Sequence, residues 1–115
     1  MVKLNKEVKK GYMYKIKNIK DESIFLENYS YDTAIIGATK EGSVLYDYDL
    51  MIQWLQETED FSYDDAVEWI EYNTLRAIPY MYNHGIAPTI VYKDEEDKYC
   101  DAFSGEYVLI EEDVK

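Results

Sequence analysis

The sequence predicts an α+β fold, in which a mostly antiparallel sheet carries two helices on one face. The sheet is expected to consist of a β-hairpin and a C-terminal β-meander. Three observations favour this fold. Two short apolar runs flank a glycine-containing loop at residues 39–43. Two segments with helical periodicity, each headed by a capping residue, fill residues 47–75. Three β-rich segments follow Pro88.

The hairpin is predicted from residues 33–38 and 44–46, the two apolar runs. Gly42 in the connecting loop suits the left-handed conformation that a short hairpin turn requires. Upstream of the hairpin, residues 12–19 alternate weakly between apolar and polar side chains and are interpreted as a strand. Residues 21–27 are interpreted as one or two helical turns.

The first helix is expected to begin at a capping aspartate, Asp47 or Asp49, and to run to about Glu57. One face of this helix is apolar and would pack on the core. That face carries Leu50, Met51, Trp54 and Leu55.

The second helix is expected to begin after Ser62, a favourable N-cap, and to run to about Leu75. Pro79 is expected to prevent any continuation, because proline lacks an amide proton. We interpret residues 73–80 as the architectural end of this helix. Arg76 is the single arginine of the chain, and we expect it to form a buried ion pair with an acid or to bond the last helix carbonyls.

The meander is predicted from three segments at residues 88–92, 99–103 and 107–110. An acidic turn at residues 94–97 and a Ser-Gly turn at residues 104–105 separate them.

Length and charge divide the chain into two parts. Its 115 residues suffice for one domain. Residues 1–20 form a basic head with seven lysines and one glutamate, a net charge of +6. Residues 21–115 form a single acidic domain with 23 acids against five bases, a net charge of −18. No membrane span, no secretory signal and a single cysteine together favour the cytoplasm.

Catalytic and metal-binding chemistry find little support. His84 and Cys100 are the only residues of their kinds, and their separation matches no nucleophilic motif. The acids at residues 94–97 lack the glycine and the ligand spacing of a calcium loop. We therefore expect no enzyme activity, no catalytic residue, no metal site and no cofactor.

The surface chemistry is the strongest functional signal. The chain has 13 tyrosines against three phenylalanines, and many of the tyrosines stand beside acids. A tyrosine ring stacks on a guanidinium group while a neighbouring carboxylate takes its charge, so the pair suits a cationic partner. The predicted partner-binding residues are Asp47, Asp49, Glu57, Glu59, Asp60, Tyr63, Asp64, Asp65, Glu68, Glu71 and Tyr72. The alternative is that these acids form only a solvated face.

Four stretches of the chain resemble a group of small uncharacterised acidic proteins encoded by phages and prophages of Gram-positive bacteria. These stretches lie at residues 32–37, 46–51, 65–80 and 87–90, and their most specific part is Tyr-Asn-Thr-Leu-Arg-Ala-Ile-Pro-Tyr at residues 72–80. The resemblance covers about half of the chain and transfers no site. It implies a mobile-element origin, and by analogy an inhibitor of host defence such as an anti-CRISPR protein.

These observations lead us to expect a non-enzymatic inhibitor that acts as an acidic decoy, a DNA mimic. DNA carries about one negative charge per 1.7 Å of its axis, and the acidic helices would imitate that array. The expected partner is a basic, nucleic-acid-binding host protein such as a CRISPR effector. Direct nucleic-acid binding and membrane binding are not expected, and a homodimer stays open. The alternative is a structural, self-associating phage protein.

Overall fold

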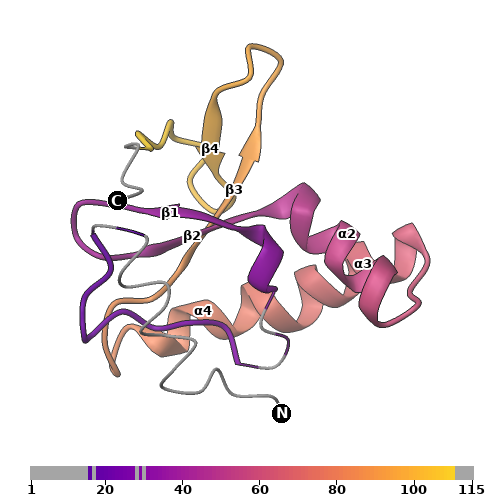
Figure 1. Cartoon of the computed structure of the whole chain (residues 1–115), viewed down its shortest axis with the longest axis horizontal. Coiled ribbons are helices and arrows are strands. Elements are labelled where there is room, and N and C mark those ends of the chain that lie inside the picture. The colour runs from indigo at the N-terminus through magenta and orange to yellow at the C-terminus, as the bar shows by residue number, and fades with distance from the viewer. Residues whose placement is uncertain (1–15, 17, 28, 30, 111–115) are drawn as a thin grey trace.

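The computed structural model describes residues 16, 18–27, 29 and 31–110 (Figure 1). Most of the expected strand at residues 12–19 and most of the basic head therefore lie outside the described residues. The chain forms, in order, the helical turn η1 (Asp32–Ala34), strands β1 (Ile35–Ala38) and β2 (Val44–Asp47), helices α2 (Tyr48–Thr58) and α3 (Tyr63–Trp69), the π-helical segment η2 (Ile70–Leu75), helix α4 (Arg76–Met81), and strands β3 (Thr89–Lys93) and β4 (Tyr99–Asp101).

The α+β prediction is confirmed, and the sheet is mixed. Its strand order is β1-β2-β3-β4. β1 pairs with β2 and β3 pairs with β4 in antiparallel fashion, whereas β2 and β3 are parallel. A parallel pair needs a crossover of a dozen residues or more, and the helices from α2 to α4 form that crossover.

The hairpin and both helix starts lie where local sequence places them. Gly42 has φ of 97°, the left-handed conformation expected of the β1–β2 loop. Asp47 accepts a hydrogen bond from the backbone nitrogen of Leu50 at 3.1 Å and caps α2. Ser62 likewise accepts one from the backbone nitrogen of Asp65 at 3.1 Å and caps α3.

The prediction that Pro79 prevents continuation of the second helix is wrong. The helix runs from α3 through η2 into α4, and Pro79 lies inside α4. The π-helical turn directly before α4 is wider than an α-helical turn, so the regular hydrogen-bond ladder is already interrupted beside the ring. The chain therefore stays helical to Met81 without the amide proton that proline lacks.

Residues 21–27 are not helical, contrary to expectation. Ser23 forms a parallel bridge with Ile86, and the backbone nitrogen of Ile24 donates to the Ile86 carbonyl at 2.9 Å. The Ile86 nitrogen in turn donates to the carbonyl of Glu22 at 2.8 Å. Backbone groups committed to a distant segment are not free to form a helical ladder.

The C-terminal strands are shorter than predicted. β4 ends at Asp101, whose Oδ1 accepts from the backbone nitrogen of Phe103 at 2.7 Å and turns the chain. Of the predicted third strand, Tyr107 forms an isolated antiparallel bridge with Cys100.

Aromatic side chains form a connected part of the core. Tyr31 and Tyr46 are fully buried, and their rings meet edge to face with centroids 6.5 Å apart. Trp54 and Tyr29 extend this contact toward Trp69 on α3. These rings hold α2 and α3 together at one end of the molecule, away from the β3–β4 hairpin (Figure 1).

Candidate functional site

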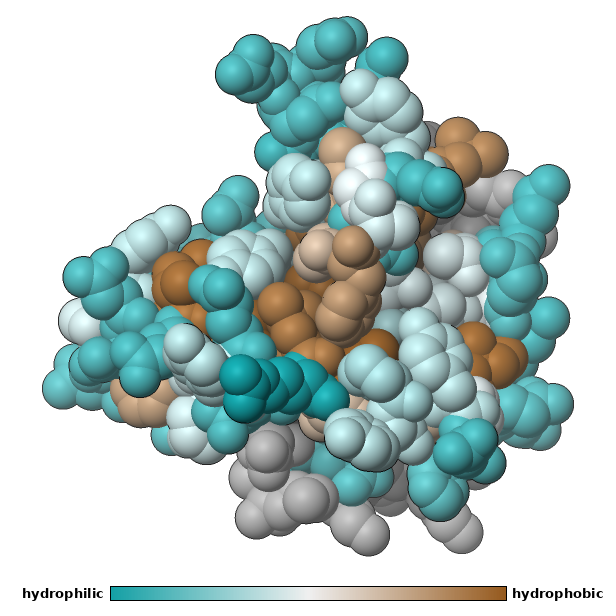
Figure 2. All heavy atoms as spheres, turned by 180° about the vertical axis from the view of Figure 1, so that it is seen from behind, coloured by the Kyte–Doolittle hydropathy of each residue, from teal (hydrophilic) through white to brown (hydrophobic). Residues whose placement is uncertain are grey.

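Ten of the eleven predicted partner-binding residues are exposed. They are carried by α2, the α2–α3 turn, α3 and η2, and Figure 2 shows hydrophilic side chains over much of this end of the molecule. The ten are Asp49, Glu57, Glu59, Asp60, Tyr63, Asp64, Asp65, Glu68, Glu71 and Tyr72.

Asp47 is the exception, because it is only 6% exposed. Its Oδ1 caps α2, and its Oδ2 accepts a hydrogen bond from the Tyr99 hydroxyl at 3.1 Å. Both carboxylate oxygens thus serve the fold, and Asp47 does not belong to the exposed surface. The Asp-Tyr-Asp pattern of the sequence does not distinguish this cap from Asp49, because both positions precede the same helix.

Asp49, Tyr63 and Glu71 lie together around Tyr48, although they come from three different helical segments. The Tyr48 hydroxyl donates to Glu71 Oε2 at 3.5 Å. The pKa of Tyr48 is raised to about 12. Burial is the main cause, followed by the negative charge of Glu71 and by the nearby Tyr63 and Asp49. Tyr48 was not in the predicted set, and its place between two acidic residues was the signal for it.

A second group lies on the other side of α3, where Asp65, Glu68 and Tyr72 surround a shallow hollow of about 280 Å³. Phe61 and Trp69 form the apolar part of its lining. This hollow therefore combines aromatic surface with two carboxylates, the combination expected of a site for arginine or lysine side chains.

The remaining acids lie around the turn between α2 and α3. Glu57 accepts a hydrogen bond from the Gln53 side chain at 2.9 Å, and Asp60 has a left-handed backbone with φ of 58°. Burial and the charge of Glu59 raise the pKa of Tyr29. Asp64 lies in the first turn of α3, where a negative charge is favoured by the helix dipole.

The segment that carries these residues is strongly acidic. Residues 47–75 contain nine acids and no lysine or arginine. Within the described part of the chain, none of the ten exposed residues forms an ion pair with a lysine or arginine side chain. Their charges are therefore open to solvent and to an external cation.

The expected buried ion pair of Arg76 is not what the structure contains. Arg76 is exposed, and its guanidinium carbon lies 4.8 Å from the centre of the Tyr72 ring. The spacing of four residues along the helix brings the two side chains together. Arg76 is thus held by a cation–π contact at the surface.

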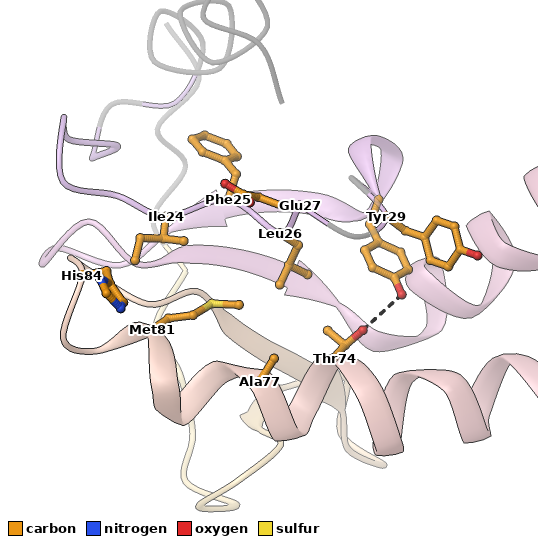
Figure 3. Close-up of a pocket in the computed structure, with 10 residues that line it drawn as sticks. Ile24, Phe25, Leu26, Glu27, Tyr29, Thr74, Ala77, Met81 and His84 are labelled. Atoms are coloured by element: carbon orange, nitrogen blue, oxygen red, sulfur yellow. Dashed lines mark hydrogen bonds between the residues drawn. The ribbon is translucent and has the colours of Figure 1, made fainter. Parts of the chain in front are cut away.

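An apolar pocket of about 320 Å³ lies between residues 24–31 and the helical run η2–α4 (Figure 3). Leu26 lies on one side of it, opposite Ala77 and Met81 of α4. At one end the hydroxyls of Tyr31 and Thr74 are 3.2 Å apart and hydrogen-bonded, and His84 lies at the other.

His84 and Cys100 were the two residues considered for catalysis. His84 is exposed in the turn after α4. Cys100 is 5% exposed in β4, and burial followed by the charge of Asp94 raises the pKa of its thiol, which disfavours the nucleophilic thiolate. Within the described residues, His, Cys, Asp and Glu side chains form no group of three that could hold a metal ion.

No helix among the described residues is both long enough and apolar enough to cross a membrane. Comparison with known protein families, curated protein sequences and solved structures found no match to this chain.

Proposed function

We propose that this protein is a phage-encoded, non-enzymatic inhibitor of a host defence system. Its acidic α2–α3–η2 surface, defined by the ten exposed residues above, would occupy the cationic nucleic-acid groove of a CRISPR effector in the bacterial cytoplasm. The proposed fold keeps the expected arrangement of helices on one face of the sheet, with a C-terminal meander. The origin and the effector come from the resemblance of four sequence stretches to phage proteins.

The observation that carries the proposal is the concentration of exposed carboxylates that form no ion pair within the described part of the chain. Eight of the nine acids of residues 47–75 are exposed, and this segment contains no base, which gives a dense electrostatic field of one sign. A groove that binds nucleic acid presents lysine and arginine side chains to phosphates, and carboxylates fixed on helices offer those side chains the same charge.

The exposed tyrosines add a contact that phosphates do not provide. Tyr63 and Tyr72 are each 58% exposed and stand beside carboxylates. A guanidinium group of the partner would stack on the ring and donate its N–H groups to the acid. The hollow around Asp65, Glu68 and Tyr72 offers a place for such a contact on this surface.

The test is competition with DNA for a purified, guide-loaded effector of the Cas9 type. Labelled target DNA bound to the effector is titrated with this protein, and fluorescence anisotropy reports the displaced DNA. We expect displacement, with the inhibition constant rising about tenfold or more as salt increases from about 50 to 200 mM. Failure to displace the DNA at either salt concentration contradicts the proposal.

A charge-reversal variant locates the surface. Changing Asp64, Asp65 and Glu68 together to lysine should weaken displacement at least about 100-fold, because like charges then face each other. The Ser62 cap survives these changes, since it bonds the backbone of Asp65 and not its side chain. Circular dichroism verifies that the variant is folded.

The matched control is the triple change of Glu41, Glu95 and Glu106 to lysine. These three acids are exposed, lie outside residues 47–75, and alter the net charge by the same amount. The control should displace DNA like the original protein. Equal weakening of both triple variants would show that net charge alone acts, and would overturn the assignment of the surface.

A further inference from the structure

A groove that shares only Glu71 with the surface of the proposed function lies between the helical run η2–α4 and the turn after β4. Its volume is about 480 Å³. Figure 2 shows this side of the molecule, where apolar side chains form a hollow bordered by hydrophilic ones. The lining residues are Glu71, Leu75, Arg76, Pro79, Tyr80 and Phe103.

The groove is rich in exposed aromatic surface. Tyr80 is 78% exposed and Phe103 is 54% exposed. Aromatic side chains and arginine are enriched at the centres of protein interfaces, where they provide most of the binding energy. A π-helical segment runs along the groove, and such segments occur frequently at functional sites.

The groove also contains one charge of each sign. Glu71 and Arg76 both line it, five residues apart on one helical run. They form no ion pair with each other, and within the described part of the chain neither pairs with another charged side chain. The Tyr72 ring holds the guanidinium face of Arg76, which leaves its N–H edge available to an external acceptor.

We propose that this groove is the contact between two copies of the chain in a symmetric dimer. If two η2–α4 runs meet antiparallel about a two-fold axis, Glu71 of one copy faces Arg76 of the second copy, and the reverse pair forms at the same time. Tyr80 and Phe103 of both copies then cover the apolar floor. The proposal stands independently of the proposed inhibitor function.

Charge complementarity favours a second copy over other occupants. A purely basic segment in the groove would meet Arg76, and a purely acidic one would meet Glu71. A second copy satisfies both, because an isologous interface must be complementary to itself. The net charge of −12 per copy opposes association, but at 0.15 M salt charges more than about 8 Å apart are largely screened from one another.

The test is sedimentation equilibrium of the full chain at about 0.15 M salt. We expect a dimer for the original sequence. Arg76→Glu and Glu71→Arg should each weaken association at least about 100-fold, because each places two like-charged pairs in the interface. The double variant, with both changes, should dimerise again because the pairs are restored with exchanged partners.

The control is Glu95→Arg, which changes net charge as Glu71→Arg does but lies in the exposed β3–β4 turn; it should remain dimeric. A monomeric original protein, or a double variant that stays monomeric, overturns the proposal. Arg76→Glu separates this contact from inhibitor binding, because Arg76 is not one of the ten residues of the proposed surface: the variant should lose the dimer and still displace DNA. A monomeric original protein that displaces DNA would refute this inference alone.

Discussion

The Tyr99 hydroxyl donates a hydrogen bond to Asp47 Oδ2 at 3.1 Å, while Oδ1 of the same carboxylate caps helix α2 at Leu50. One side chain thus joins β4, the last strand of the sheet, to the start of α2, although Tyr99 and Asp47 are 52 residues apart. Burial, followed by the charge of Asp47 and its hydrogen bond, raises the pKa of Tyr99 to about 12. The contact anchors the acidic helices against the sheet.

Replacing Asp47 should destabilise the fold. Asp47→Ala removes both the helix cap and the acceptor for Tyr99, and we expect the free energy of unfolding to fall by about 1–3 kcal/mol. Asp47→Asn retains an oxygen for the cap and should lose less. Tyr99→Phe should cost about 1 kcal/mol, and less when Asp47 is already alanine, because the shared hydrogen bond is lost only once. Urea unfolding measures all of these changes.

Asp49→Ala serves as the control for Asp47→Ala, because Asp49 is exposed in the first turn of the same helix. Its loss removes only a favourable charge near the helix dipole, worth about 0.3–1 kcal/mol. Equal losses for the two variants would contradict the structural role of Asp47.

The fold should lose stability in alkali. Burial raises the pKa of Tyr31 to about 12, whereas an unfolded tyrosine titrates near 10. Between these values the unfolded chain has released the proton that the folded chain retains, so stability is complete below about pH 10 and declines as pH rises toward 12. Unfolding followed at a series of alkaline pH values measures this decline.

Tyr31→Phe should flatten that decline, because the variant has no proton to lose at this position. It should also lower stability at neutral pH by about 1 kcal/mol, since the hydrogen bond between Tyr31 and Thr74 disappears. Tyr82→Phe is the matched control, because Tyr82 is 65% exposed. An unchanged alkaline decline in Tyr31→Phe would argue against the raised pKa of Tyr31.

Two glycines should respond differently to substitution. Gly85 has φ of 152°, and a Cβ atom there would lie 2.5 Å from the carbonyl oxygen of Glu22, which accepts a hydrogen bond from Ile86. Gly85→Ala should therefore cost about 3 kcal/mol or more through strain and steric conflict. Gly105 has φ of 74°, and a Cβ atom there would meet no other atom within 4 Å, so Gly105→Ala should cost only about 1 kcal/mol. Thermal unfolding measures the stability of both variants. Similar losses of stability in the two would contradict the close packing of residues 22–24 against Ile86.

Local chemistry predicted much of the fold. The caps at Asp47 and Ser62 and the turn at Gly42 depend on side chains and backbone within a few residues, and all three form as expected. Pro79 misled the prediction because its effect depends on the π-helical turn beside it, and periodicity does not reveal such a turn. Of the predicted partner-binding residues, ten are exposed, whereas Asp47 is buried and hydrogen-bonded to a strand residue 52 positions later; their role in binding a partner stays a prediction.

Short-range periodicity, capping and charge are enough to predict the α+β class, the helix starts and the acidic character of residues 47–75. The parallel pairing of β2 with β3 and the burial of Asp47 emerge only in the folded chain, because each depends on a strand that is distant in the sequence and comes to lie beside it. The net gain of a single hydrogen bond or ring contact, about 1 kcal/mol, is too small to select that neighbour without the packing of the whole core.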